Sequence, residues 1–424
     1  MGINPPILSG QTAVTDPDPR SSLVAVVERN TGVLTVFSGD ESHVRAEVLV
    51  REGGRSLGHI KLDGAHDFVE RAVSSTPVGV PARGWTDGAG RDIPATIIIC
   101  TLGRNPLLTL AVQAALAQRH GHFNVVVVDN DPLSGNARRL LAQVSDPRLS
   151  IIDEPQRGLS RARNQGIRVA TGEVVAFSDD DAILDPAWLA SLLDVFASAP
   201  PGEVGAVTGP VFAAELECRS QRFFESRGGF PKGLQPLVWS LRTPSPECAR
   251  LGNRADGGPL FPLATARVGA GASMAFTRAA LDALHEFDVC LGAGAGTNGG
   301  EDLDAFTRVL RAGFVIVYNP DAVVHHVHRR DMEGLEKQIH GNGTGMAALL
   351  VKSLCQHPVG ILTLLKRFPK IVSRVAPGTE RMKGSEDDVP PVLGRQEVRG
   401  FLRGPFLYLR ECVAQRLRKA REWQ

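Results

Sequence analysis

The stretch Gly172-Glu-Val-Val-Ala-Phe-Ser-Asp-Asp-Asp181 joins an apolar run to three consecutive carboxylates. Its apolar part, Val174 to Phe177, is typical of a buried strand. Three like charges at a strand end repel one another and lose hydration, so a divalent cation is an effective counter-charge for them. Hard oxygen ligands suit Mg²⁺ or Mn²⁺ that carries phosphates. An acidic turn in water, leading into a helix at Asp185-Pro186, is the alternative interpretation.

Strand and helix signals alternate around this stretch. Besides the strand that ends at the aspartates, three apolar strands are predicted, over Ala95 to Cys100, Phe123 to Val128 and Leu149 to Ile152. Helices are predicted between them, from an Asn105 cap to about Arg119, near Asn136 to Val144, and from a Ser160 cap over Arg161 to Ala170. Such alternation implies parallel crossovers, so the sequence predicts an α/β fold with a doubly wound, mostly parallel sheet.

Polar clusters follow three of the predicted strands, at Thr101–Arg104, Asp129–Asp131 and Asp179–Asp181. Ligands of doubly wound sheets bind beyond the carboxyl ends of the strands. We therefore expect these three clusters to meet in one binding site.

The order of these motifs resembles that of inverting nucleotide-sugar glycosyltransferases of the GT-A fold, of the family 2 type. The resemblance covers roughly residues 92 to 330. The motifs that carry it are Ile99-Cys-Thr-Leu-Gly-Arg104, Val127-Val-Asp-Asn130, Arg157-Gly-Leu-Ser-Arg-Ala-Arg-Asn-Gln-Gly166, Phe177-Ser-Asp-Asp-Asp181 and Gly299-Gly-Glu-Asp302.

The resemblance implies roles for individual residues. Six of them would bind the nucleotide-sugar donor: Thr101, Arg104, Asp129, Arg163, Asp179 and Asp180. In this set Asp129 would accept hydrogen bonds from a uracil or thymine base, and Arg163 would face the nucleotide or its phosphates. The metal, Mn²⁺ or Mg²⁺, would be held by Asp181 with Asp179, and it would neutralise charge on the departing diphosphate.

A glycine-rich segment, Gly292-Ala-Gly-Ala-Gly-Thr-Asn-Gly-Gly300, precedes Glu301 and Asp302. That glycine density permits close backbone approach and positive φ angles. The two acids open a predicted helix over Leu303 to Leu310, whose dipole favours carboxylates at its start. Glycosyl transfer needs a base for the acceptor hydroxyl, and the resemblance assigns this role to Asp302, with Glu301 orienting the acceptor or the sugar. Simple helix capping by this acidic pair is the alternative.

Three histidines follow a predicted strand over Phe314 to Val317. If the segment is extended, His326 and His328 lie on one side and His325 on the other. Related transferases often carry a histidine here that completes the metal site, and His326 matches that position best, with His328 second. A purely structural histidine is the alternative. Imidazole ligation would favour Mn²⁺ without excluding Mg²⁺.

Composition is consistent with a cytoplasmic enzyme. The 424 residues carry a net charge of +1, which gives no support for a nucleic-acid partner. The six cysteines have neither metal-ligand spacing nor a paired framework, which fits a reducing compartment. The start, Met1-Gly-Ile-Asn-Pro-Pro6, lacks the features of a secretory signal, and no window reaches the about eighteen apolar residues of a membrane span.

Six segments are predicted along the chain. They are a flexible N-terminus (1–20), a small β-rich module (21–88) with antiparallel strands, the GT-A domain (92–330), a helical extension (331–375), a linker (376–394) and a basic amphipathic helix (395–424). The last helix has two interpretations: peripheral contact with an anionic membrane, at its inner face, or docking on the core or a second subunit.

The function predicted first is a metal-dependent, non-processive glycosyltransferase. It would move a hexosyl, N-acetylhexosaminyl or deoxyhexosyl group from UDP or dTDP to an acceptor hydroxyl, with inversion. The acceptor would be a glycan, a lipid-linked intermediate or a small molecule, in cell envelope or glycoconjugate biosynthesis. Two alternatives remain: a nucleotidyltransferase, although Thr101-Leu-Gly-Arg104 offers only one glycine for a phosphate loop, and a non-catalytic nucleotide-sugar or carbohydrate-binding protein.

Overall fold

The computed structural model describes residues 7–8, 17–40, 42–64, 67–230, 233–358, 360–375 and 388–422. Most of the N-terminal segment predicted as flexible (1–20), and residues 376–387 of the predicted linker, lie outside these ranges. Within them, the backbone N–H groups of Ile7 and Leu8 donate to the carbonyls of Val36 and Phe37 at 3.0 Å.

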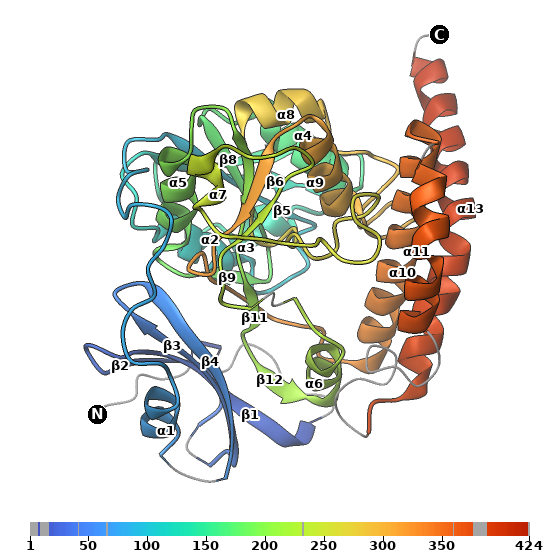
Figure 1. Ribbon diagram of the computed structural model, residues 1–424. Helices are drawn as coiled ribbons and strands as arrows, with labels where there is room; N and C mark the ends of the chain where they lie inside the picture. Colours follow the sequence, from blue (N-terminus) through green and yellow to red (C-terminus); the bar gives the residue numbers. More distant parts are fainter. Residues whose placement is uncertain are drawn as a thin grey trace.

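The largest sheet has nine strands in the order β14-β13-β16-β10-β15-β8-β5-β6-β7. Its strands β5, β6 and β8 are labelled in Figure 1. These strands are β5 (Ala95–Thr101), β6 (Phe123–Asp129), β7 (Leu149–Asp153), β8 (Val174–Asp179), β10 (Val204–Thr208), β13 (Leu237–Trp239), β14 (Asn253–Arg254), β15 (Met274–Thr277) and β16 (Val315–Tyr318). Strands β7, β6, β5 and β8 run parallel, whereas β15 lies antiparallel between β8 and β10. The predicted α/β class with a mostly parallel core is confirmed.

Both faces of this sheet are covered by helices. Ile97 and Ile99 of β5 pack into one hydrophobic cluster, and Ile98 packs into the cluster on the opposite face. This alternation explains why β5 reads as a continuous apolar run. The helices of the first face are α2 (Leu108–Leu116), α3 (Asn136–Leu140) and α5 (Trp188–Ser198); those of the second are α4 (Leu159–Val169), α8 (Arg278–Leu284) and α9 (Glu301–Arg311).

Helix starts differ from the sequence prediction. Ser160 is not a cap, because α4 begins at Leu159 after Gly158, and the Ser160 hydroxyl instead donates to the Leu291 carbonyl at 2.8 Å. Asn105 caps a turn rather than the helix: its side-chain oxygen accepts the N–H of Leu107 at 3.0 Å, and α2 starts one residue later. Long-range and turn contacts replaced the local capping bonds in both cases.

A small three-stranded sheet, in the order β11-β17-β9, lies beside the large one. Its strands are β9 (Ala182–Leu184), β11 (Val211–Ala213) and β17 (Val324–His326). In the antiparallel pair β17–β9, His326 is opposite Ala182. The backbone N–H of Val327 also donates to the carbonyl of Asp181 at 2.9 Å. This pairing brings the histidine segment next to the last aspartate of the triplet.

The N-terminal segment forms a five-stranded sheet with α1 (Phe68–Ser74). Its strands are β1 (Pro17–Glu28), β2 (Val33–Ser38), β3 (Arg45–Glu52), β4 (Arg55–Asp63) and β12 (Leu216–Cys218). The prediction of purely antiparallel strands is wrong, because β1 and β3 run parallel, with β2 on the other edge of β1. Strand β12 comes from the segment after β11, so two distant parts of the chain build this sheet. Helix α6 (Arg219–Ser226) directly follows β12 in the sequence. Two short helices lie elsewhere: η1 (Pro132–Ser134) between β6 and α3, and α7 (Pro246–Ala249) between β13 and β14.

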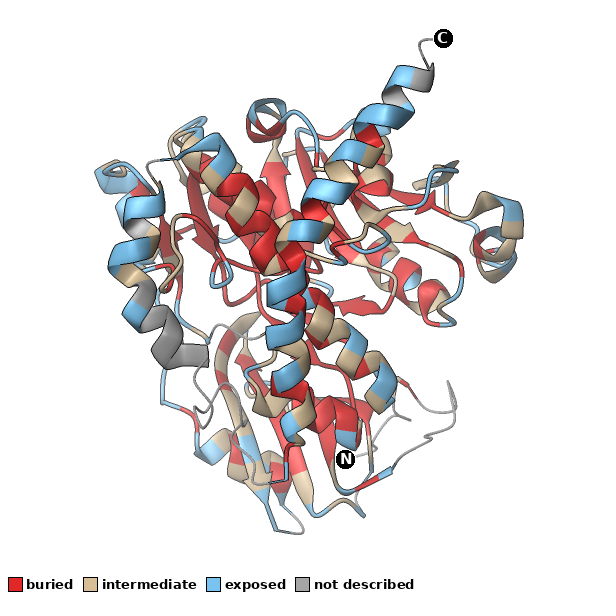
Figure 2. Cartoon of the chain, turned by 90° about the vertical axis from the view of Figure 1, so that its right-hand side faces the viewer, coloured by how far each residue is buried: buried red, intermediate tan, exposed pale blue. Residues whose placement is uncertain are grey.

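Three helices end the described chain: α10 (Met332–Gln356), α11 (Gly360–Val375) and α13 (Pro391–Glu422). Helix α13 begins inside the stretch predicted as linker and packs along α10 (Figure 1). Glycines make this approach close. A Cβ atom on Gly343 would collide with the Glu397 carbonyl, and one on Gly400 would collide with the His340 carbonyl. One face of α13 is thus buried, while Figure 2 displays exposed residues along the same helix.

Replacing Gly400 by leucine is expected to lower the free energy of unfolding by about 1–3 kcal/mol, because the side chain has no room against α10. Denaturant titration measures this, and hydrogen exchange should accelerate in α13. The control is Arg399→Leu, which adds the same side chain at an exposed position of the helix. Equal stability of the two variants would contradict the packing described for this helix pair.

Candidate active site

Three strand ends meet as the sequence predicted. In the parallel pairs of β5, Cys100 is opposite Asp179 and Thr101 is opposite Asp129. The loop after β5, the aspartates after β6 and the aspartate triplet after β8 therefore share one edge of the sheet. This is the edge at which doubly wound sheets bind ligands.

The aspartate triplet is held by polar neighbours. The Thr101 hydroxyl donates to Asp180 Oδ2 at 2.5 Å, and the Asn105 amide donates to Asp180 Oδ1 at 3.5 Å. Burial, followed by the charge of Asp181, raises the pKa of Asp180 to about 7. Burial likewise raises the pKa of Asp179, while the nearby Arg163 opposes the rise. Both shifts arise first from burial of the carboxyl groups, and the neighbouring carboxylates add to them.

Asp179, Asp181 and His326 form a group that could hold a metal ion, since their ligand atoms all lie within 4.8 Å of one another. His326 Nε2 lies 3.0 Å from Asp181 Oδ1. Burial pushes the pKa of Asp181 upward, but the charge and hydrogen bond of His326 outweigh it and lower the pKa overall. Burial also lowers the pKa of His326, yet Asp181 dominates and raises it. Two carboxylates and one imidazole fit a divalent cation such as Mn²⁺.

Arg163 links the triplet to the second acidic motif. Its guanidinium is buried and lies 2.8 Å from Glu301 Oε1 and 3.6 Å from Asp179 Oδ1. Burial, then the charge of Asp302, raises the pKa of Glu301 to about 7, with Arg163 opposing. Acidic segments more than one hundred residues apart in the sequence thus converge on one arginine.

Asp302 lies in the first turn of α9, which follows the glycine segment. Its Oδ2 accepts the backbone N–H of Gly271 at 2.9 Å, and its Oδ1 accepts the N–H of Leu303 at 2.8 Å. Gly300, with φ of 90°, directly precedes the helix, and a Cβ atom there would lie 2.7 Å from the Gly345 carbonyl of α10. The glycine at this position is therefore required by backbone conformation and by close packing.

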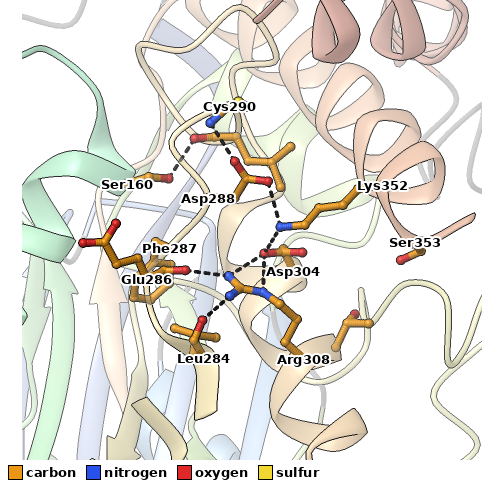
Figure 3. A network of polar contacts seen from close by, with 12 residues as sticks. Ser160, Leu284, Glu286, Phe287, Asp288, Cys290, Asp304, Arg308, Lys352 and Ser353 are labelled. Atoms are coloured by element: carbon orange, nitrogen blue, oxygen red, sulfur yellow. Dashed lines mark hydrogen bonds and ion pairs between the residues drawn. The ribbon is translucent and has the colours of Figure 1, made fainter. Parts of the chain in front are cut away.

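A buried ion network fixes this loop and α9 to α10 (Figure 3). Lys352 Nζ lies 2.7 Å from Asp288 Oδ2 and 2.8 Å from Asp304 Oδ2. Arg308 also contacts Asp304, and the N–H of Cys290 donates to Asp288. The helical extension therefore braces the segment that carries Asp302.

The predicted nucleotide side is less enclosed. Arg104 is exposed and reaches Asp131 at 3.2 Å, as Arg157 does at 2.7 Å. Asp129 is fully buried, and its Oδ2 lies 3.4 Å from Arg138. Sequence reasoning missed the pairing of Asp129 with Arg138. The local signal for it was the pair of arginines, Arg138 and Arg139, in the helix that follows the strand.

The histidine segment alternates as predicted. His326 and His328 face each other, whereas His325 stacks on Phe37 of the N-terminal sheet with ring centroids 3.9 Å apart. His328 contacts Glu225 of α6 at 2.8 Å. Sequence reasoning did not identify Glu225, because nothing near it in the sequence indicates a partner about one hundred residues away.

Parts of this chain are similar in sequence to known proteins. Residues 96–255 match the family model described as glycosyl transferase family 2. The glucosyl-dolichyl phosphate glucuronosyltransferase of Haloferax volcanii is 30% identical over 134 residues, which are 30% of this chain and 41% of that protein. This chain therefore spans less than half of the length of that relative. The succinoglycan biosynthesis protein ExoM of Rhizobium meliloti is 28% identical over 264 residues, covering 60% of this chain and 74% of that protein.

One solved structure that a comparison matches to this chain is a mannosyltransferase from Pyrobaculum calidifontis in complex with GDP-Man and Mn²⁺. The likeness has a TM-score of 0.48 at 17% identity, and it covers 76% of this chain and 90% of that one. It is too distant for its ligands to be assigned to this chain.

Proposed function

We propose that this protein is a metal-dependent, non-processive glycosyltransferase, because residues 96–255 match the model of glycosyl transferase family 2. It moves a sugar from a UDP or dTDP donor to an acceptor hydroxyl with inversion. The observation that carries the proposal is the buried Arg163, which contacts both Asp179 of the triplet and Glu301 of the later acidic motif. A cation-bound diphosphate and an attacking hydroxyl need such neighbouring sites.

In this proposal Asp302 takes the proton of the acceptor hydroxyl as the anomeric carbon is attacked. The N–H of Gly271 holds one oxygen of Asp302 in place. Glu301 orients the acceptor or the sugar, and Arg163 keeps the buried carboxyl group of Glu301 in position. An aligned base and hydroxyl contribute through both proton transfer and proximity.

The donor side uses the remaining site residues. Asp181, Asp179 and His326 would hold Mn²⁺ or Mg²⁺, and when bound, the cation supplies positive charge against the departing diphosphate. The nucleotide and sugar are bound by Thr101, Arg104, Asp129, Arg163, Asp179 and Asp180. Uracil or thymine specificity rests on Asp129, whose carboxylate is already close to Arg138.

A panel of nucleotide sugars tests the function. The full chain is incubated with UDP-, dTDP- and GDP-linked sugars, Mn²⁺ or Mg²⁺, and candidate glycan or lipid-linked acceptors. Acceptor-dependent release of UDP or dTDP supports the proposal, and release of pyrophosphate would identify a nucleotidyltransferase instead. Donor binding without any release would identify a binding protein, and turnover of GDP-sugars alone would contradict the base assignment.

The proposal also includes a surface partner: the protein is cytoplasmic and contacts the inner face of an anionic membrane. Within the described part of the chain, none of the helices combines the length and apolarity that crossing a bilayer demands. Helix α13 nevertheless has a row of exposed apolar side chains, with 75% of Leu402 and 68% of Phe406 accessible. The row consists of Val398, Leu402, Phe406, Leu409, Val413 and Leu417.

Charge favours an anionic lipid surface over a second protein as the occupant. Exposed arginines flank the row at positions 395, 399, 403, 410, 416 and 418, and among the described side chains of α13 no acidic one is exposed. Apolar insertion and attraction of arginines to anionic headgroups act together in such helices. A lipid-linked acceptor would then lie on the same surface as the enzyme.

The double variant Leu402→Glu/Phe406→Glu is expected to bind anionic vesicles about 100-fold more weakly, because each of the two lost apolar contacts contributes about 1.5 kcal/mol. Co-sedimentation with phosphatidylglycerol vesicles measures binding, with phosphatidylcholine vesicles as the neutral reference. The matched control is Leu133→Glu, since Leu133 is 98% exposed on another element. Unchanged pelleting, or a dimer that the double variant dissociates, would contradict the lipid assignment.

A further inference from the structure

The sheet edge that carries the candidate cation group continues over three more strands. Asp179, the last residue of β8, is opposite Cys100 of β5. Thr101 of β5 is opposite Asp129 of β6, which in turn is opposite Asp153 of β7. Adjacent strands are about 4.8 Å apart, so the ends of β6 and β7 lie about 10–14 Å from the end of β8. An extended nucleoside diphosphate covers a span of this size, so a ligand with its phosphates at β8 brings its base to β6 and β7.

The carboxylate of Asp129 is closed to a base. Its side chain is 0% exposed, and both of its oxygens have partners in the protein. Oδ1 accepts the N–H of Asp131 at 3.1 Å, and Oδ2 lies 3.4 Å from Nη1 of Arg138. A hydrogen bond requires direct approach of the two atoms to about 3 Å. Asp129 therefore acts on a base through the arginine that it pairs with.

Arg138 combines a fixed position with donors that a ligand can reach. Its Nη1 lies 2.7 Å from Asp153 Oδ1 as well as 3.4 Å from Asp129 Oδ2, so carboxylates at the ends of two neighbouring strands hold the guanidinium. Its side chain is nevertheless 46% exposed. A guanidinium has N–H donors on three nitrogens. Among the described residues, the side-chain contacts of Arg138 use Nη1, which leaves the N–H groups of Nε and Nη2 for a ligand.

The chemistry of a guanidinium determines which bases fit beside it. Uracil and thymine have a carbonyl oxygen, O4, where cytosine has an amino group, and guanine has O6 where adenine has an amino group. Arginine donates hydrogen bonds and accepts none, so it binds a carbonyl oxygen and leaves an amino group unpaired. An unpaired polar group that has lost its water lowers affinity. A base with a carbonyl oxygen at this edge is therefore favoured.

We propose that Arg138 determines the base specificity of the donor site: its guanidinium, positioned by Asp129 and Asp153, donates to a carbonyl oxygen of the base. The inference rests on the proposed function, because it needs a nucleoside diphosphate with its phosphates at the cation group. It assigns a role to a residue outside the motifs that carry the family resemblance. Uracil, thymine and guanine share the required carbonyl group, whereas cytosine and adenine lack it at this edge.

Nucleotide binding to the full chain tests the assignment without any acceptor. UDP, dTDP, GDP, CDP and ADP are titrated by calorimetry in the presence of Mn²⁺. The wild type should bind UDP or dTDP at least about tenfold more tightly than CDP, the discrimination expected of one good side-chain contact to a base edge. A preference for GDP over ADP instead would support Arg138 as the base-reading residue and identify guanine as the carbonyl-bearing base.

Arg138→Lys is expected to lower the affinity for the preferred nucleotide roughly 10–100-fold, the range for loss of a hydrogen bond to a charged group, and to leave CDP and ADP almost unchanged. Lysine keeps a positive charge beside Asp129 and Asp153, which protects the fold. Its single nitrogen cannot serve these carboxylates and a base together, as the guanidinium fork can. The matched control is Arg139→Lys, the same substitution at the next exposed position of α3, which should bind every nucleotide as the wild type does.

The selectivity between bases distinguishes a base contact from a structural role. An equal loss of affinity for all five nucleotides in Arg138→Lys would show a structural role only and overturn the assignment. Unchanged affinity for the preferred nucleotide would overturn it too, because the base would then bind to Asp129 or to another residue. A wild type that binds all five nucleotides alike would show that the base is not read, and the proposed transfer reaction would stand. A wild type that binds none of them would remove the proposed donor site, and this inference with it.

Discussion

Replacing Asp302 by asparagine is expected to slow sugar transfer by about 10²–10⁴-fold, the range attributable to a general base. Asparagine keeps the size of the side chain, and its amide oxygen can still accept the N–H of Gly271. In the wild type this N–H donates to Asp302 Oδ2. It cannot take the proton of the acceptor hydroxyl. The rate constant for transfer at saturating donor measures the effect, and donor affinity should remain close to that of the wild type.

Asp282→Asn is the matched control, because Asp282 lies exposed on α8 and its change removes one charge without touching the site. Its transfer rate should equal that of the wild type. A rate for Asp302→Asn within a few-fold of wild type, with donor binding retained, would exclude Asp302 as the base. Lost donor binding would instead assign it to the donor site.

Asp181→Asn is expected to abolish stimulation by Mn²⁺ and to lower transfer about 10³-fold, because charge stabilisation of the diphosphate is worth several kcal/mol. The substitution removes one of two carboxylates from the cation group and the charge that raises the pKa of His326. Activity is measured against Mn²⁺ concentration, and chelation of wild-type enzyme should reproduce the loss.

The exposed Asp92 provides the control: Asp92→Asn should keep the metal dependence of the wild type. If the Mn²⁺ concentration that gives half-maximal activity were the same for Asp181→Asn and the wild type, Asp181 would not be a ligand. The activity would then depend on a cation bound elsewhere or on no cation.

Local patterns were enough to predict the parallel strands β5 to β8, the strand β16 and the polar ends of β5, β6 and β8, but not the strands β10, β13, β14 and β15. The run Ala95 to Cys100 is apolar on both faces because helices cover both sides of β5. Parallel pairing then places the residues after β5, β6 and β8 at one edge, which follows from topology alone. Period-two alternation likewise separated His326 and His328 from His325.

Contacts between distant segments could not be predicted in this way. The local pattern predicts Ser160 as a helix cap, but its hydroxyl bonds to Leu291, a partner that only tertiary structure supplies. The same holds for Glu225 beside His328 and for the bracing of Asp304 by Lys352. Such pairs depend on how elements are placed in space, and local propensity carries no information about them.

Strand β12 has a practical consequence for anyone who wishes to trim or recombine this chain. It is covalently part of the portion that carries the candidate site, yet it extends the N-terminal sheet by pairing with β1. Excising residues 17–63 would leave β12 with an unpaired edge and uncover Phe212 and Leu216, which share a hydrophobic cluster with Val24 and Val26. We therefore expect that cutting the chain between the two portions yields insoluble protein, and that grafted homologues must exchange both pieces together.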